Sequence, residues 1–384
     1  MNGLDLSSLV PRLAAAEPSQ LVPTLDRFLA TCAWYRGVRL LVPDHGDRVL
    51  VDPHGDRRPI AIEGPLADAY RSCDLVLAGA GADAAILVPL RMRADCVGIL
   101  EVRADGVPGE ADLATVAAIG HIVGLVLWAG RNDMEFVERC RRLHPMSLSA
   151  EIQWDLLSSR VETGFGYAAA GWMEPAYDVG GDTFDLAVDV GVLWVSSIDA
   201  MGHGLEAGVA SGVALSAIRN ARRTGGGVAD QAAAVNEALL RLWQGERFAT
   251  LLLLRLDVAT GEVEAVNAGH PLARRVRRGN VDALGLAVDV PPGLTGTATY
   301  RAQRFRLEPG DRIVAASDGV AGAAIDGGVP YGADRIDRAL AEWHDLAPAH
   351  LVRTLAWQVL SHAGDRLRDD ATIVCVDWGG GDGA

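Results

Sequence analysis

The sequence predicts a two-domain protein of mixed helices and strands, α/β in the broad sense and α+β in detail. At 384 residues the chain is longer than one ordinary hydrophobic core requires. Hydrophobic residues make up 49% and charged residues 22%, which is typical of a globular protein. Before residue 130, paired apolar runs lead into a long apolar segment, whereas after Gly164 short apolar runs alternate with glycine-rich turns. This change of pattern predicts a boundary between two different domains.

The charge and cysteine content exclude several classes of function. A net charge of -15 argues against nucleic-acid binding, which needs a basic surface. All 35 basic residues are arginine, so the chain lacks the lysine of a P-loop or of a Schiff base. The five cysteines are scattered and fit buried thiols in a reducing compartment (Cys32, Cys73, Cys96, Cys140, Cys375). No signal peptide is visible in residues 1–20, so we expect a cytoplasmic protein.

The N-terminal region begins with a helical lead-in over residues 1–20 and a second helix over 21–33. Two pairs of strand-like runs follow, at 37–42 with 47–51 and at 84–90 with 96–102. Residues 113–130 are almost entirely apolar and reach the length of a membrane span. Gly120, His121 and Gly124 interrupt that segment. We therefore expect no membrane span but a helix packed on a sheet or on a second subunit.

This order of elements resembles a GAF sensory domain over residues 21–130. A Val88-Pro-Leu90 strand, a short turn, a Gly98-Ile-Leu100 strand and then a helix are typical of that family. The resemblance implies a small-molecule ligand or a partner copy. The sequence shows no convincing haem or iron–sulfur ligand set, and we interpret the isolated His45, His54 and His121 as structural or solvated.

Residues 131–163 are polar and helical in pattern, and Pro145 divides them into two pieces. This segment is the predicted linker between the domains. It would either transmit a change in subunit packing or act as a passive spacer, and the sequence leaves both open.

From residue 164 the chain predicts short strands and amphipathic helices. Strands are expected at 167–173, 193–198, 248–257, 262–267, 301–307, 312–317 and 369–376, and helices at 205–223, 230–243, 334–343 and 347–362. The last residues, 379–384, have the composition of a disordered tail.

Aspartates recur at or near the ends of these strands, at Asp182, Asp199, Asp318 and Asp369 or Asp370. One such residue would be an ordinary turn or cap residue. Four of them, most in glycine-rich turns, suggest a common site. Carboxylate ligands without histidine or cysteine suit Mg²⁺ or Mn²⁺. Several carboxylates favour two ions, which can activate water and neutralise a phosphoryl group.

Six motifs identify the second domain, residues 164–378, as similar to the SpoIIE/RsbU-like branch of PP2C-type (PPM) serine/threonine phosphatases. They are Gly180–Asp185, Asp199–Gly204, Phe248–Thr250, Asn267–His270, Ser317–Gly319 and Asp369–Thr372. The resemblance implies an αββα sandwich with two metal ions, Mn²⁺ or Mg²⁺, at one edge.

The resemblance also implies roles for individual residues. Asp182 and Asp199 would be catalytic through metal-bound water, with Asp199 bridging both ions. The carbonyl of Ala200 would supply a further ligand oxygen. Asp318 and one of Asp369 and Asp370 would complete the second ion's shell, and we favour Asp369.

Other polar residues in these motifs have two readings. His203 and His270 are either general acids or loop-stabilising side chains, and we favour the second because geometry must precede an acid–base claim. Asn267 is expected to stabilise a turn. The basic run 274–278 would steer an acidic partner or form a solvated hairpin edge. The loop at 284–293 departs from the family pattern, at a place that would set the choice of substrate.

Taken together, the resemblance implies a cytoplasmic metal-dependent phosphoprotein phosphatase regulated by the GAF-like domain. Its implied substrate is a phosphorylated anti-sigma-factor antagonist of the STAS type in a partner-switching pathway. We also expect a homodimer through the helix at 113–142. The alternative is a regulatory binding module that grips a partner without appreciable hydrolysis, and Asp199→Asn would separate the two.

Overall fold

The structure is a computed structural model and describes residues 6–93, 95–106, 108–130, 134–157, 159–174, 180–271, 273–325, 328–364 and 367–380. Parts of three sequence predictions lie outside these residues: the start of the lead-in (1–5), the segment 175–179 before Gly180, and most of the C-terminal tail (381–384). The chain divides into two compact units, residues 1–145 and 146–384, and each is described by itself.

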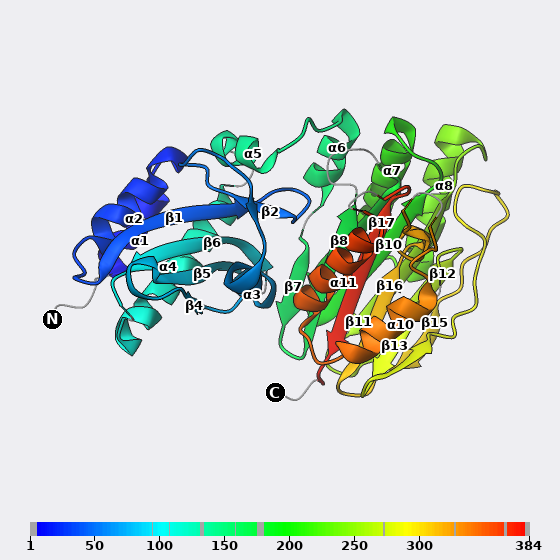
Figure 1. Cartoon of the computed structure of the whole chain (residues 1–384). Coiled ribbons are helices and arrows are strands. Elements are labelled where there is room, and N and C mark those ends of the chain that lie inside the picture. The colour runs from blue at the N-terminus through cyan, green and yellow to red at the C-terminus, as the bar shows by residue number, and fades with distance from the viewer. Residues whose placement is uncertain are drawn as a thin grey trace. The chain divides into compact units, whose positions relative to one another are not determined.

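The N-terminal unit contains one antiparallel sheet in the order β3-β2-β1-β6-β5-β4 (Figure 1). Its strands are β1 (Tyr35–Pro43), β2 (Val49–Val51), β3 (Ile60–Ala61), β4 (Val76–Ala78), β5 (Ala85–Met92) and β6 (Asp95–Ala104). Its helices are α1 (Leu6–Ala14), α2 (Leu21–Leu29), α3 (Gly64–Ser72), α4 (Glu110–Ala129) and α5 (Glu135–Arg141), with short 3₁₀ turns at Pro18–Gln20 and Gly81–Asp83.

Alternation along the strands gives this sheet two apolar faces. In β1, Leu40 faces a core shared with α1, α2 and α4, whereas Leu41 faces a second core under α3. In β5, Val88 and Leu87 divide in the same way. Successive side chains point to opposite sides of a strand, so a continuous apolar run marks a strand that is covered on both sides.

Helix α4 packs along the sheet, as expected of a core helix. Its buried residues recur at helical spacing, from Val116 to Leu127. At Gly120 an added Cβ would come within 2.6 Å of Val88 Cγ1, and at Gly124 within 2.6 Å of the Arg91 carbonyl oxygen. These two glycines therefore allow close contact with β5. Within the described residues α4 is the one helix long and apolar enough to cross a membrane, and such a helix is weak evidence of a span.

The C-terminal unit contains two antiparallel sheets, β15-β12-β11-β10-β9 and β14-β13-β16-β17-β8-β7. Their strands are β7 (Val161–Gly164), β8 (Tyr167–Glu174), β9 (Asp182–Asp189), β10 (Val192–Ala200), β11 (Ala249–Asp257), β12 (Glu262–Ala268), β13 (Arg274–Arg277), β14 (Asn280–Ala283), β15 (Gln303–Arg306), β16 (Asp311–Ala316) and β17 (Ala371–Trp378). The helices are α6 (Leu148–Leu156), α7 (Leu205–Arg223), α8 (Val228–Trp243), α9 (Asp318–Gly322), α10 (Ala333–Glu342) and α11 (Pro348–His362).

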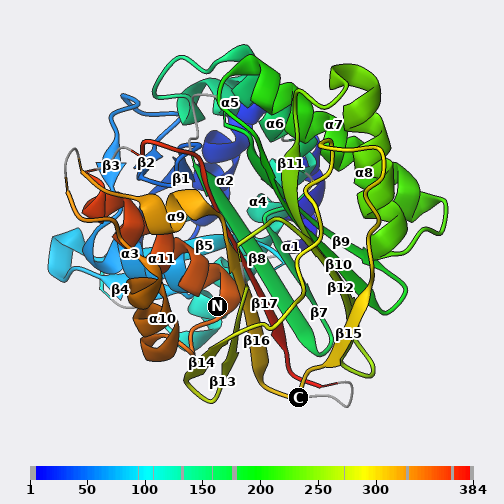
Figure 2. The ribbon, with the colours of Figure 1, turned by 90° about the vertical axis from the view of Figure 1, so that its right-hand side faces the viewer.

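The two sheets stack face to face with helices outside, which confirms the predicted αββα sandwich. Helices α7 and α8 cover the first sheet, while α10 and α11 cover the second (Figure 2). Between the sheets lies a core that includes Phe184, Leu254, Ile313 and Val374. A separate core, with Ile198 and Leu251 among its members, fills the space under α7 and α8.

The region predicted as a linker, 131–163, holds two short helices on either side of Pro145. Helix α5 belongs to the first unit and α6 to the second. In the first unit His45 binds Glu138, with 2.5 Å between Nε2 and Oε1, and Arg141 donates from Nε to the Pro43 carbonyl at 3.1 Å. These contacts hold α5 against the loop that follows β1.

Candidate active site

Two aspartates meet across neighbouring strands at one end of the sandwich. Asp182 begins β9 and pairs in register with Asp199 near the end of β10. Directly paired residues point to the same side of a sheet. Phe184, two residues after Asp182, packs in the core between the sheets, so both carboxylates point into that space.

The second sheet brings polar groups to the same end. Ser317 follows β16 and pairs with Thr372 at the start of β17: the Ser317 amide donates to the Thr372 carbonyl at 3.0 Å, and the Thr372 amide donates to Ser317 Oγ at 2.9 Å. This pairing places Asp318, which begins α9, beside the Asp369-Asp370 turn. Asp182 is 4% exposed, whereas Asp318 and Asp369 are exposed, so the acidic group runs from a buried floor to an open rim.

Glycines let these turns come together. An added Cβ at Gly181 would lie 2.0 Å from the carbonyl oxygen of Ala200, and one at Gly180 would lie 2.2 Å from Asp370 Cγ. At Gly319 it would lie 1.8 Å from the Asp370 carbonyl oxygen. The glycines of the Gly180-Gly181 and Ser317–Gly319 motifs are therefore required by close backbone approach around the aspartates.

Burial and mutual repulsion raise the pKa values of the acidic groups. The pKa of Asp182 lies well above its usual range because of burial, and the charge of Asp199 raises it further. Burial, with the charges of Asp318 and Asp369, raises the pKa of Asp199 to about 6. Burial raises the pKa of Asp370 to about 6, with Asp369 and Asp199 adding to the effect. Asp199 thus lies within electrostatic range of the other four aspartates.

The donor set fits a hard divalent cation. Its ligand atoms are carboxylate oxygens with one backbone carbonyl nearby, which is the chemistry preferred by Mg²⁺ and Mn²⁺. Asp182 Oδ2 is buried and has no hydrogen-bond partner among the described residues. In the described part of the chain no three His, Cys, Asp or Glu side chains stand at the spacing of a formed metal site.

Asp369 and Asp370 have different surroundings. Asp370 is 8% exposed, and its carboxylate accepts the backbone amides of Gly181 and Asp182. Asp369 is exposed and accepts the Asp370 amide at 3.0 Å through Oδ1. Asp370 thus holds the turn before Asp182, whereas Asp369 lies at the rim, where its carboxylate is open to a metal ion.

The two motif histidines separate in the structure. His203 is exposed on the loop after β10, between glycines whose φ values are positive (Gly202 +89°, Gly204 +84°). His270 is 2% exposed, and burial lowers its pKa to about 4. Its Nδ1 lies 3.1 Å from Oγ1 of Thr250, the cross-strand partner of Asp199. His270 is therefore neutral and structural in character at neutral pH.

Asn267 stabilises the turn that leads to His270, as predicted. It donates from Nδ2 to the His270 carbonyl and accepts the His270 amide, both at 3.0 Å. The basic run 274–278 contains the whole of β13, and it is largely paired within the unit: Arg274 binds Asp337 at 2.7 Å and Arg277 binds Asp311 at 2.6 Å. This pairing favours the hairpin reading of the run over a steering role.

Sequence reasoning missed the contribution of α6. Gln153 is 4% exposed and donates from Nε2 to the carbonyls of Gly180 and Asp182. Arg219 of α7 links the end of α6 to β9, since it donates to the Leu156 carbonyl and to Asp185, each at 2.7 Å. No local motif marks either residue as part of the site.

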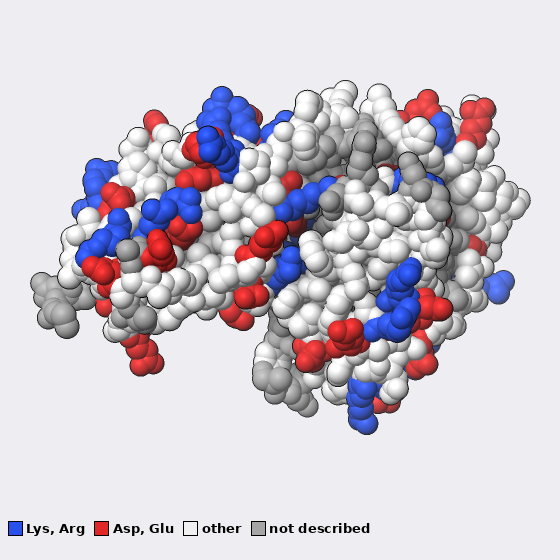
Figure 3. All heavy atoms as spheres, viewed as in Figure 1, with Lys and Arg blue, Asp and Glu red and all other residues white. Residues whose placement is uncertain are grey.

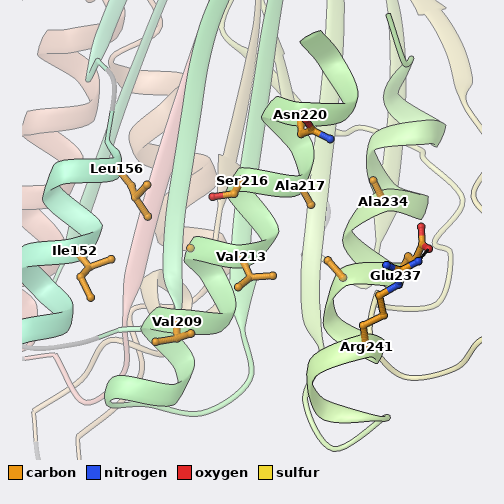
Figure 4. A pocket seen from close by; sticks show the side chains of 12 residues that line it. Ile152, Leu156, Val209, Val213, Ser216, Ala217, Asn220, Ala234, Glu237 and Arg241 are labelled. Carbon is orange, nitrogen blue, oxygen red and sulfur yellow. Dashed lines mark hydrogen bonds and ion pairs between the residues drawn. The ribbon is translucent and has the colours of Figure 1, made fainter. Parts of the chain in front are cut away.

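A separate groove of about 630 Å³ lies among α6, α7 and α8 (Figure 4). Ile152 and Leu156 form one wall, with Val209 and Val213 of α7 beside them. Other residues of α7, such as Ala210 and Ala214, face the sheet. The groove is therefore on the outer side of the helices, and the sheet separates it from the aspartates.

Comparison with known proteins agrees with this geometry. Residues 189–379 match the family model described as Stage II sporulation protein E (SpoIIE), a range that includes Asp199, Asp318 and the Asp369–Asp370 pair and begins after Asp182. A comparison with curated proteins gave no match.

Two solved structures show the same fold. The SiaA-PP2C domain of Pseudomonas aeruginosa superposes with a TM-score of 0.52 at 18% identity, covering 60% of this chain and 94% of that one. A chain with the RsbU and RsbW domains of a Mycobacterium tuberculosis protein superposes with a TM-score of 0.50 at 23% identity, covering 56% of this chain. This chain spans 60% of the length of the mycobacterial one. Residues 189–379 are a SpoIIE-type domain with the PP2C phosphatase fold.

Proposed function

We propose that this protein hydrolyses phosphoserine or phosphothreonine on a partner protein, using two Mn²⁺ or Mg²⁺ ions held by the acidic end of the sandwich. The observation that carries this proposal is the convergence of five aspartates from both sheets on one open end, with Asp182 Oδ2 buried and unpartnered among the described residues (Asp182, Asp199, Asp318, Asp369, Asp370). PP2C-type phosphatases depend on Mn²⁺ or Mg²⁺. When bound, such ions supply an activated water nucleophile and neutralise the charge of the phosphoryl group.

The residues of the chain would hold the ions and keep the surrounding turns in place. Asp182 and Asp199 would hold the ions between the sheets, together with the carbonyl oxygen of Ala200, which packs against Gly181. Asp318 and Asp369, at the exposed rim, would complete the second ion's shell. Asp370 would keep the Gly180-Gly181 turn in place. His270 would support Thr250 next to Asp199.

The proposed substrate is a phosphorylated STAS-type anti-sigma-factor antagonist in a partner-switching pathway. Support comes from the family and from the mycobacterial structure, in which an RsbU domain occurs on one chain with an RsbW domain. An exposed rim suits a phosphoserine presented by a folded protein. The face in Figure 3 shows arginines interspersed with acidic residues, which fits a protein partner better than nucleic acid.

The N-terminal unit is proposed as a GAF-like regulatory domain that takes a small-molecule ligand and forms a homodimer. Support for dimerisation comes from the outer side of α4, where Leu125 is 54% exposed in a helix that has no charged residue after Asp112. A second copy of the chain could cover this exposed apolar side chain. The protein is proposed to be cytoplasmic, with α4 as a packed helix and not a membrane span.

The test is hydrolysis of p-nitrophenyl phosphate and of a phosphoserine peptide by the full-length protein, with and without Mn²⁺. We expect turnover that requires Mn²⁺ and is lost in Asp199→Asn. Turnover that persists in Asp199→Asn, or wild-type protein that binds Mn²⁺ without any turnover, would contradict the proposed site.

A further inference from the structure

Arg247 lies beside the loop that follows the Asp199 strand. It stands between α8 and β11, and its Nη1 donates to the Met201 carbonyl at 3.4 Å. The same Nη1 is 3.1 Å from the position that a Cβ on Gly202 would occupy. The guanidinium is thus in contact with a backbone segment that starts two residues after Asp199.

The backbone fixes this position. The register of β10 and β11 pairs Ala200 with Ala249, and the Met201 amide donates to the Phe248 carbonyl at 3.0 Å. The ladder therefore continues one step beyond β10. Arg247 lies two residues before Ala249, at the end of the sheet where Asp199 stands and on the side that α7 covers.

The ion-pair partner of Arg247 is one that a phosphate could displace. Arg247 forms an ion pair through Nη2 with Glu206, in the first turn of α7. The Glu206 side chain is 67% exposed, whereas that of Arg247 is 24% exposed. Ion pairs with a solvent-exposed carboxylate contribute little in water. A phosphate dianion, which can accept two parallel N–H bonds from the guanidinium fork, is a stronger partner.

The negative charge of the site favours a positively charged residue beside it. A phosphorylated substrate must approach an end of the sandwich that carries five aspartates, and like charges repel. The chain contains no lysine, so arginine is the available permanent cation. The run at 274–278, by contrast, is engaged in ion pairs on β13.

We propose that Arg247 is a substrate-binding residue that exchanges Glu206 for the phosphoryl oxygens of the incoming phosphoprotein. This inference rests on the proposed phosphatase function and names a binding group for the same site. Glu206 would hold the guanidinium in place between turnovers and compete with the substrate for it.

The test compares Arg247→Gln, Arg247→Lys and Glu206→Gln in the full-length protein at saturating Mn²⁺. A charge-assisted hydrogen-bond pair corresponds to about 10- to 100-fold in affinity. We expect Arg247→Gln to raise KM for a phosphoserine peptide, and Ki for inorganic phosphate, by about that factor. Arg247→Lys should lie between because it keeps the charge but loses the fork. Glu206→Gln should lower both constants, since the competing carboxylate is gone.

Arg241→Gln is the matched control, because Arg241 forms an exposed i,i+4 pair with Glu237 on α8. It should leave both constants unchanged. The opposite signs for Arg247 and Glu206 separate substrate binding from a loop clamp. If Arg247→Gln and Glu206→Gln both raised the Mn²⁺ requirement with no change in the inorganic phosphate Ki, Arg247 would only hold the loop and the inference would be wrong. Wild-type protein without Mn²⁺-dependent turnover would instead overturn the proposed function, and this inference with it.

Discussion

The side-chain amide of Gln153 donates a hydrogen bond to the carbonyl of Gly180, with 2.6 Å between Nε2 and O. It also reaches the carbonyl of Asp182 at 3.2 Å. One side chain of α6 thereby holds the backbone on both sides of Gly181, the residue that packs against the Ala200 carbonyl. The helix before the phosphatase sheets is therefore part of the support of the acidic site.

Replacing Gln153 by leucine should weaken both stability and metal binding. Two buried carbonyls would lose their shared donor, and each unpaired buried group costs about 1–3 kcal/mol. The turn before Asp182 would loosen, so we expect a higher Mn²⁺ concentration for half-maximal activity. Thermal melting and Mn²⁺ titration of activity measure the two effects.

Gln231→Leu is the control for this change. Gln231 is 2% exposed on α8 and donates to the Gly226 carbonyl at 3.3 Å, away from the aspartates. It should lose stability with an unchanged Mn²⁺ requirement. Equal Mn²⁺ requirements in Gln153→Leu and wild type would show that α6 does not support the site.

Asp199→Asn should make the metal-free protein more stable while abolishing activity. Asparagine has nearly the same size but removes one charge from a group whose pKa is raised to about 6 by burial and by Asp318 and Asp369. Relief of about 1 kcal/mol would raise Tm by about 2–4 °C for a unit of this size. Mn²⁺ should then stabilise the wild type and leave the variant unchanged. A lower Tm in metal-free Asp199→Asn would contradict repulsion among the aspartates.

Asp369→Asn and Asp370→Asn should fail in different ways. Asp370 accepts amides from the turn before Asp182, so its replacement should lower Tm in the absence of metal as well as activity. Asp369 is exposed and, among the described residues, accepts the adjacent amide of Asp370, so its replacement should mainly raise the Mn²⁺ requirement. Melting curves with and without Mn²⁺ separate these results. The reverse pattern would make Asp370 the ligand.

Much of the phosphatase unit could be predicted because its chemistry is local in sequence. Asp199 follows an apolar strand and precedes a glycine-rich turn, and α7 has the predicted bounds, 205–223. Gln153 could not be found in this way. A single glutamine in a helical pattern carries no sign of its partners, which lie 27 and 29 residues further along the chain.

The N-terminal unit shows a similar limit. Helix α3 was not predicted, because its nine residues, Gly64–Ser72, lack a long apolar stripe. Tyr70, 1% exposed, joins it to a core with Leu41 and Ile99 from the sheet. Short helices of this kind are stabilised by tertiary packing and not by intrinsic propensity.

Leu125→Glu should dissociate the proposed dimer without unfolding the protein. Leu125 is 54% exposed on α4, so a charge there is costly only if a second copy covers it. Light scattering of the full-length protein should show a dimer for the wild type and a monomer for the variant. Leu242→Glu, at a 58% exposed position on α8, should remain dimeric. A monomeric wild type would rule out this interface.

The ion pair between His45 and Glu138 should give the N-terminal unit a stability that depends on acid pH. Burial alone would raise the pKa of Glu138, but the hydrogen bond and charge of His45, with Arg141 and Arg142, lower it to about 2 from an ordinary 4.5. A folded pKa below the unfolded one stabilises the fold above pH 4.5, and that contribution is lost as pH falls from 4.5 toward 2. Its upper limit is about 3 kcal/mol.

Glu138→Gln should therefore melt below the wild type at pH 6, and the difference should shrink through that window in melting curves of the full-length protein. Glu135→Gln, an exposed position on the same helix, is the control and should follow the wild type at every pH. A difference between Glu138→Gln and wild type that stayed constant from pH 6 to 3 would mean that α5 is held by packing and not by this charge.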